Sequence, residues 1–299
     1  MDFRQISCFV AVAEELHFGR AAARLNLSQP PLSQQIKGLE DRLRVRLFER
    51  NRRSVRLTPA GEAFLPYAHQ VLNAAAAGAD AARRVAGGEI GELRIGYSAS
   101  ALYSDEVLAT IARYRRRYPA VEIRLVENTT RTCTREVEAG RVDLAIVRGP
   151  LPETAEGWPA DRRIVVSRER LMVALPADHA LAGRDRLALA ELGDERFVIM
   201  ARQFGTALND LLDRLFAAAG LRPRIALETA EMASLLGLVG AGAGIAIVPE
   251  AVTGHRSGHV AFRPLTDRNA EVELFLLLPP LPSPTAVRLR AEMMAEGAG

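Results

Sequence analysis

The chain has 299 residues, of which 48% are hydrophobic and 25% charged, a composition typical of water-soluble proteins with two or three domains. With only two cysteines, Cys8 and Cys133, the chain cannot have a framework of several disulfides. It also contains no run of 18 apolar residues, the length needed to span a membrane. The net charge of +3 is uneven: residues 1–63 carry eleven basic and seven acidic residues, and the remainder is slightly acidic. Asp2 stands where a secretory signal would be basic, so we expect a cytoplasmic protein. The basic excess of residues 1–63 predicts a polyanionic partner for this part of the chain.

Two closely packed helices are predicted within residues 18–43. The first has a small apolar face against which another helix can pack. That face consists of Ala21, Ala22 and Leu25. Ser28 occupies the expected N-cap of the second helix, and Pro30 and Pro31 lie in its first turn, where a missing N–H costs nothing. Its core stripe at helical spacing consists of Leu32, Ile36, Leu39 and Leu43.

The opposite face of this second helix is polar. It consists of Gln29, Ser33, Gln34 and Lys37. Amides and hydroxyls can pair with base edges in the major groove, while Lys37 and the helix N-terminus suit phosphates. This pattern predicts the recognition helix of a helix-turn-helix. Exposed Gln and Ser residues are also common on helix faces that bind nothing.

An arginine-dense segment follows. Residues 42–56 hold seven arginines and one acid, Glu49. Short apolar pieces around residues 51–54 predict a hairpin, the wing of a winged helix, with Arg52 and Arg53 near its tip, where arginine can enter a narrow minor groove. A charged run is often only a solvated surface, as could hold for Arg42, Arg44 and Arg46. The order of the features within 45 residues favours DNA binding.

Residues 58–88 predict one long helix. Thr58 caps it, Pro59 takes the first position, and Gly87 and Gly88 end it. The apolar face consists of Phe64, Leu65, Ala68, Val71, Leu72, Ala75 and Ala79. A 60-residue domain cannot cover a face of this length, so we expect a second copy of the helix to do so. The alternative is a linker packed within its own chain.

From residue 93 onward, short β-rich runs alternate with helical segments. The runs are 93–98, 121–127, 142–148, 170–176, 196–200, 224–228 and 244–249. This alternation predicts mostly parallel sheets with helices on both faces.

Ligands bind such sheets beyond the carboxyl ends of the strands. The candidate residues at those ends are Ser98, Ser100, Thr129, Thr130 and Arg148 in the first half, and Met200, Arg202, Gln203 and Phe204 in the second. Hydroxyls at helix N-termini with arginines opposite suit a small carboxylate. Ser100 and Thr130 could equally be helix caps.

The same region offers little for catalysis, metal binding or redox chemistry. The glycines within 240–244 lie between a helix and a strand, the reverse of a dinucleotide-binding loop. His255 and His259 are the one histidine pair at metal spacing and lack further ligands nearby. Cys133 could be a redox switch but lacks a resolving partner within its domain. We therefore expect no enzyme activity, no metal and no cofactor.

Residues 1–65 resemble the N-terminal domain of LysR-type transcriptional regulators. The resemblance runs from MDFRQ through FVAVAEELHFGRAAARLNLSQPPLSQQIKGLEDRL to RVRLFERNRRSVRLTPAG. The Pro30-Pro31 pair and Gln34 resemble the branch that governs catabolism of aromatic compounds. In the family, positions matching Gln29, Pro30, Ser33 and Gln34 meet bases or flanking phosphates, and the position of Arg53 reaches the minor groove.

The resemblance implies an α/β multidomain fold. A winged helix-turn-helix at 1–58 and a dimerisation helix at 59–88 would precede an effector-binding domain at 92–299, similar to periplasmic binding proteins. Lobe I would comprise 92–161 and 268–299, and lobe II 162–267. Positions matching Ser98 to Ser100, Thr130 and Arg202 to Phe204 line the inducer cleft in the family.

The expected function is therefore sequence-specific transcription regulation in response to a small molecule, expected to be a carboxylate, bound between the lobes. Further expected partners are promoter DNA, a second copy through the linker helix, a homotetramer, and RNA polymerase. The candidate DNA-binding residues are Arg20, Ser28, Gln29, Pro30, Pro31, Ser33, Gln34, Lys37, Arg52 and Arg53. The alternative is a constitutive repressor or architectural protein whose α/β domain serves assembly only; a more distant one is an enzyme with an appended DNA-binding domain.

Overall fold

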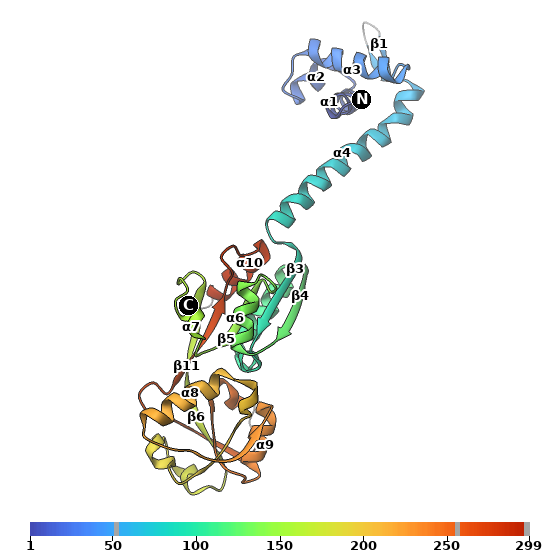
Figure 1. Cartoon of the computed structure of the whole chain (residues 1–299). Coiled ribbons are helices and arrows are strands. Elements are labelled where there is room, and N and C mark those ends of the chain that lie inside the picture. Colours follow the sequence, from blue (N-terminus) through green and yellow to red (C-terminus); the bar gives the residue numbers. More distant parts are fainter. Residues whose placement is uncertain (51–53, 255–257, 296–299) are drawn as a thin grey trace. The chain divides into compact units, whose positions relative to one another are not determined.

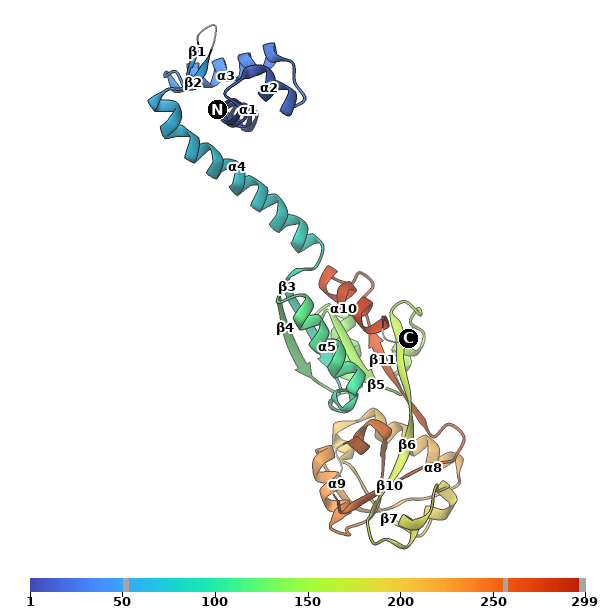
Figure 2. The same cartoon turned by 180° about the vertical axis from the view of Figure 1, so that it is seen from behind.

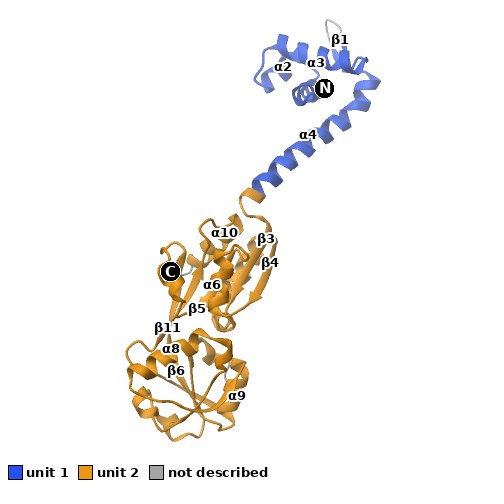
Figure 3. Cartoon of the chain, in the orientation of Figure 1, with its two compact units in different colours: residues 1–84 blue, residues 85–299 orange. Residues whose placement is uncertain are grey.

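The computed structural model of the chain describes residues 1–50, 54–254 and 258–295. Residues 1–84 and 85–299 form two compact units, which Figure 3 colours separately. No helix within the described residues is long and apolar enough to cross a membrane.

The first unit is a winged helix-turn-helix followed by a long helix. Its elements are α1 (Phe3–Glu15), α2 (Phe18–Arg24), α3 (Gln29–Leu43), β1 (Phe48–Arg50), β2 (Val55–Leu57) and most of α4 (Pro59–Ala86). The strands β1 and β2 pair antiparallel, with Phe48 opposite Leu57. The predicted helix pair, hairpin and long helix are all confirmed.

An aromatic cluster lies at the centre of this unit. The ring of Phe9 in α1 lies 5.3 Å from that of Phe48 in β1 and 5.1 Å from that of Phe64 in α4. The predicted core residues Leu32, Ile36 and Leu39 are fully buried beside it, whereas Leu43 is half-buried.

The helix α4 begins in contact with the turn before the wing. The Thr58 hydroxyl accepts a hydrogen bond from the Gly61 amide (3.0 Å), which confirms the predicted cap, and donates one to the Arg46 carbonyl (2.7 Å). Gly61 packs so closely that an added Cβ would lie 2.2 Å from the Leu47 carbonyl oxygen.

The apolar face of α4 divides into two parts. Its first turns pack on the core of the same unit, through Phe64, Leu65, Ala68 and Leu72. In contrast, Val71 is 42% exposed and Val85, near the end of the helix, is 54% exposed. The beginning of the face is therefore covered within its own unit, and the remaining part is left for the expected partner helix.

The second unit consists of two α/β lobes. Lobe I contains β3 (Ile90–Tyr97), η1 (Ala99–Tyr103), α5 (Asp105–Arg117), β4 (Ala120–Glu127), α6 (Thr130–Glu138), β5 (Leu144–Arg148), α7 (Glu153–Glu156) and α10 (Pro284–Met294). Lobe II contains η2 (Ala180–Gly183), η3 (Leu189–Leu192), β7 (Arg196–Met200), η4 (Arg202–Phe204), α8 (Ala207–Ala218), β8 (Arg224–Thr229), α9 (Met232–Gly240), β9 (Ala246–Pro249), η5 (Glu250–Gly254) and β10 (Val260–Pro264). The helices α5 and α6 lie on opposite faces of the lobe I sheet, as Figures 1 and 2 show from either side.

Two long strands, β6 (Arg163–Pro176) and β11 (Glu271–Leu277), connect the lobes, and we call them the crossing strands. They pair antiparallel along residues 163–170 of β6, after which β6 pairs antiparallel with β9 and β10. The expected mostly parallel arrangement holds for β3 with β4 and β5 and for β7 with β8. It is wrong for the crossing strands, because the chain passes between the lobes once in each direction.

The residues that follow α4 contact α10 within the second unit. Gly88 has a positive φ of 71°, and an added Cβ would lie 2.5 Å from the backbone of Pro284. The guanidinium of Arg288 donates hydrogen bonds to the Gly87 carbonyl (2.7 Å), the Glu89 carboxylate (3.1 Å) and the Tyr118 hydroxyl (3.2 Å). One arginine of α10 thus binds both the segment that follows α4 and the end of α5.

Candidate functional site

The helix α3 begins as predicted, with Ser28 at the N-cap and Gln29 as the first helical residue. The Ser28 side chain makes no capping hydrogen bond. An N-cap side chain normally accepts a hydrogen bond from the second or third helical amide, and in α3 these residues are Pro30 and Pro31, which have no amide hydrogen. The Ser28 hydroxyl therefore stays available to an external partner.

The polar side chains along α3 are accessible. Gln29, Gln34 and Lys37 are exposed, Ser33 and Pro31 are half-buried, and the apolar stripe on the other side is buried. Among the described residues, Gln29, Gln34 and Lys37 have no side-chain hydrogen bond or ion pair. The polar face of α3 can therefore form hydrogen bonds with an external partner, while the buried apolar stripe holds the helix in place.

The remaining predicted DNA-binding residues differ in their surroundings. Arg20 is exposed in α2, but its guanidinium pairs with the Glu15 side chain (3.2 Å) and hydrogen-bonds the Glu15 carbonyl. Arg52 and Arg53 lie outside the described residues. Of the basic wing, the structure therefore describes the two strands β1 and β2.

Glu40 organises the start of the wing, a role that sequence reasoning missed. One oxygen of its carboxylate accepts the amides of Leu47 (2.9 Å) and Phe48 (3.2 Å), and the other accepts Arg50 (3.0 Å). The guanidinium of Arg50 also lies 4.7 Å above the Phe18 ring.

In lobe I, the predicted cleft residues converge at the end of β5. The Ser98 hydroxyl accepts the amide of Arg148 (3.1 Å), and the Thr130 hydroxyl donates to the Arg148 carbonyl (2.8 Å). All three residues are buried. The helix cap is Thr129, which accepts the amide of Thr132 at 3.2 Å. The cap interpretation therefore applies to Thr129 and not to Thr130 or Ser100.

The guanidinium of Arg148 is already bound within the protein. It donates to the Ser100 carbonyl (3.1 and 3.2 Å) and forms an ion pair with Glu169 of β6 (2.5 Å), with 4% and 13% of the two side chains exposed. Glu169 also accepts the amide of Ala251 in η5 (3.1 Å). The Arg148–Glu169 pair thus joins lobe I, a crossing strand and lobe II, and Glu169 is a second residue that sequence reasoning missed.

In lobe II, Arg202 is also paired. Its guanidinium binds both carboxylate oxygens of Asp213 in α8, at 2.8 and 2.9 Å. Hydrogen bonding from Arg202 lowers the pKa of the Asp213 carboxyl. Gln203 and Phe204 follow in η4 and are exposed. The predicted residues of this lobe therefore lie together, with the arginine engaged.

The other candidate chemistry does not assemble into a site. Within the described residues, no three His, Cys, Asp or Glu side chains are placed to bind a metal, and His255 lies outside them. Gly240 ends α9 and Gly244 precedes β9, the predicted turn. Cys133 is fully buried, which raises the pKa of its thiol to about 12.

Comparison with known families divides the chain in the same order. Residues 3–62 match the bacterial regulatory helix-turn-helix protein, LysR family, and residues 86–298 match the LysR substrate binding domain.

Full-length relatives agree. The chain is 40% identical to the uncharacterized HTH-type transcriptional regulator YnfL of Escherichia coli over 93% of this chain and 92% of that protein. It is 39% identical to the transcriptional regulator AlsR of Bacillus subtilis over 83% and 80% of the two chains. Its structure is similar to that of CbnR, a LysR family transcriptional regulator, with a TM-score of 0.81, 28% identity, and 98% and 100% of the two chains covered. CbnR is also known in complex with its target DNA, and that structure superposes with a TM-score of 0.77.

Proposed function

Because the chain belongs to the LysR family, and is thus a DNA-binding transcriptional regulator with an effector-binding domain, we propose that the polar face of α3 reads its operator. The observation that carries this proposal is that Gln29, Gln34 and Lys37 are exposed without a partner in the described structure. Side-chain amides can donate and accept in pairs on base edges, while a lysine on the same face suits a phosphate.

The test compares glutamines at two places in the first unit. We expect Gln29→Ala to lower discrimination between operator and mismatched duplexes about tenfold, the value of one lost base contact. Gln70→Ala removes an exposed glutamine of α4 and should leave both affinities unchanged. Titration of each variant against both duplexes at fixed salt measures the effect. Unchanged discrimination by Gln29→Ala would remove α3 from base recognition.

We propose that the effector is a small carboxylate bound at the carboxyl ends of β3, β4 and β5. The support is chemical: Ser100 and Thr129 supply oxygen atoms there, and the N-terminus of α6 favours negative charge. Arg148 and Arg202 would contribute only by exchanging Glu169 or Asp213 for the ligand. A ligand that made this exchange would change how the lobes are held, which is the requirement for coupling to DNA.

The effector class can be tested by thermal shift of the full chain against small aromatic and dicarboxylic acids. We expect an acid to raise the melting temperature and its neutral amide to have no effect, because only the acid is charged. Arg202→Ala should reduce induction while basal DNA affinity stays near that of the parent protein. Equal losses of both would make Arg202 a structural residue.

The exposed part of α4 is proposed to bind a second copy of this helix. Val71 and Val85 are more than 40% exposed, and seven of the thirteen residues between them are alanines. Small residues allow close helix approach. Val71→Asp should lower the mass measured by light scattering to that of a monomer, and an unchanged mass would contradict this placement. Assembly into tetramers, contact with RNA polymerase and absence of catalysis remain part of the proposal by family membership.

A further inference from the structure

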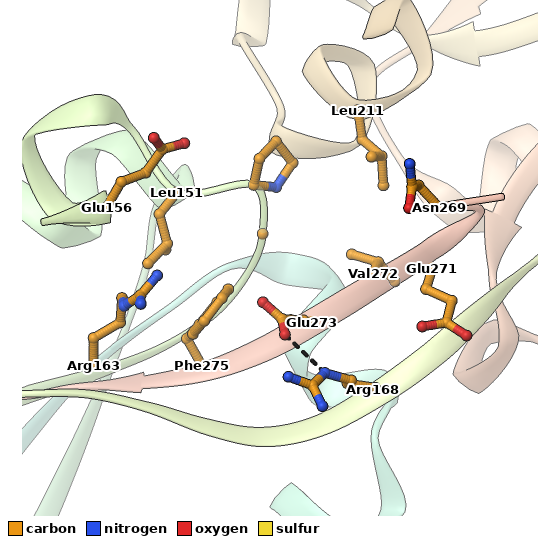
Figure 4. Close-up of a pocket in the computed structure, with 12 residues that line it drawn as sticks. Leu151, Glu156, Arg163, Arg168, Leu211, Asn269, Glu271, Val272, Glu273 and Phe275 are labelled. Carbon is orange, nitrogen blue, oxygen red and sulfur yellow. Dashed lines mark hydrogen bonds and ion pairs between the residues drawn. The ribbon is translucent and has the colours of Figure 1, made fainter. Parts of the chain in front are cut away.

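A cavity of about 460 Å³ lies against one face of the crossing strands (Figure 4). Its walls come from the loop Gly149–Leu151 after β5, from β6 and β11, and from Leu211 of α8. This volume lies within the range of small-molecule sites, and the walls include both lobes.

The cavity is separate from the predicted effector cleft. None of the predicted effector-binding residues lines it. Glu169 of β6 binds Arg148, whereas the next residue back, Arg168, lines the cavity and pairs with Glu273 of β11 at 2.8 Å. Successive residues of a strand point to opposite faces. The cavity therefore lies on the face of β6 opposite the Arg148–Glu169 pair.

One end of the cavity presents an unmatched donor. The Nε atom of Arg163 is buried and has no hydrogen-bond partner among the described residues, and the guanidinium lies 5.9 Å from the Phe275 ring. Leu151 and Glu156 lie at this same end (Figure 4). A buried donor without an acceptor is unfavourable, so a ligand oxygen here would be bound strongly.

The rest of the lining has an excess of carboxylates. Glu156 and Glu271 have no ion pair with any residue in the described part of the chain, and Glu273 is shared with Arg168. An anion without a positive group would face these carboxylates, and a simple cation would leave Arg163 without an acceptor. Both charges are needed on one ligand.

We propose that this cavity is a second ligand site, which binds a small zwitterion with an apolar body, of the class of apolar α-amino acids. The ligand carboxylate pairs with Arg163 and its ammonium with a free carboxylate of the lining. Its side chain lies against Phe275, Leu151 and Leu211, which give an apolar surface between the charged groups. Because Leu151 and Leu211 belong to different lobes, the bound ligand holds the lobes in one arrangement.

The test uses the full chain and four probes: L-leucine, L-phenylalanine, N-acetyl-L-leucine and L-leucinamide. We expect at least one free amino acid to bind in isothermal titration calorimetry, and the two singly charged derivatives to bind about tenfold more weakly or not at all. Absence of binding by both amino acids overturns the proposal. Equal binding of the acetylated derivative overturns the zwitterion requirement and with it the proposal.

Variants locate the site. Arg163→Gln should weaken amino-acid binding about tenfold or more, whereas Arg214→Gln, an exposed arginine of α8, should not change it. Glu271→Gln keeps the shape of an exposed side chain and should weaken binding even if Arg163→Gln fails to fold. Thr129→Val alters only the predicted effector cleft and should bind the amino acid normally. Loss of binding in Thr129→Val, with none in Glu271→Gln, would move the ligand to the effector cleft and overturn the second site.

Discussion

Both thiols of the chain are buried, Cys8 on the core side of α1 and Cys133 on the core side of α6. Desolvation raises the pKa of both, that of Cys133 to about 12. A thiol reacts through its thiolate, which is scarce at pH values well below its pKa.

We therefore expect neither cysteine of the native protein to react with a thiol-specific disulfide reagent at pH 8, and both to react in denaturant. Absorbance of the released chromophore counts them. Rapid reaction of one thiol in the native protein would identify an accessible cysteine and would favour a redox switch.

Gly61 is required by packing and not by backbone conformation. A Cβ at this position would overlap the Leu47 carbonyl, so Gly61→Ala should destabilise the first unit by about 2 kcal/mol or more. Gly78→Ala makes the same change farther along α4, where no atom lies within 4 Å, and should be neutral or stabilising by up to about 1 kcal/mol. Differential scanning calorimetry of the full chain separates the two. Equal melting temperatures would disprove the close contact.

Residue types at the cleft could be predicted, but their partners could not. The order of strands predicts Arg148 and Arg202 at the cleft, and Arg148 does end β5 while Arg202 follows β7. Their present partners, Glu169 and Asp213, come from elements placed by tertiary folding, and no spacing rule connects them to the arginines.

Among the elements, the wing depends on one carboxylate of α3. Glu40→Gln keeps the shape but weakens two charge-assisted hydrogen bonds and the Arg50 ion pair, so we expect a loss of about 1–2 kcal/mol of stability and weaker DNA binding. Glu49→Gln, an exposed acid in the adjacent strand, removes the same charge and serves as the control. Operator affinity and urea unfolding measure both. If the two variants lose operator affinity equally, the loss of one negative charge explains the weaker binding, and the hydrogen bonds of Glu40 to the wing do not.

The helix pair within residues 18–43 and the long helix α4 were predictable because caps and apolar periods are local signals. The strands β10 and β11 and the first half of β6 were missed. The centre of β6 reads Ser167–Arg168–Glu169–Arg170, which lacks an apolar alternation. It is a strand because β11, about a hundred residues later, pairs with it, and such pairing has no local signature.

For the whole molecule, the Arg148–Glu169 pair is a buried ionic connection between lobe I and a crossing strand. Glu169→Gln leaves a buried guanidinium without its counterion, so we expect a loss of about 3–5 kcal/mol. The double variant Arg148→Met with Glu169→Gln should recover part of this loss, because the unpaired charge is gone. Melting temperatures of both single variants and the double variant give the coupling energy.

The exposed Arg168–Glu273 pair on the opposite face provides the comparison. Glu273→Gln should lower the melting temperature by about 2 °C or less. Additive effects of Arg148→Met and Glu169→Gln would show that the buried pair does not couple.

Arg288 of α10 hydrogen-bonds Gly87 and Glu89, so the backbone that directly follows the long helix is fixed within the second unit. With 28 residues, α4 is about 42 Å long. One arginine of α10 thus fixes the backbone at which this long helix joins the effector-binding domain.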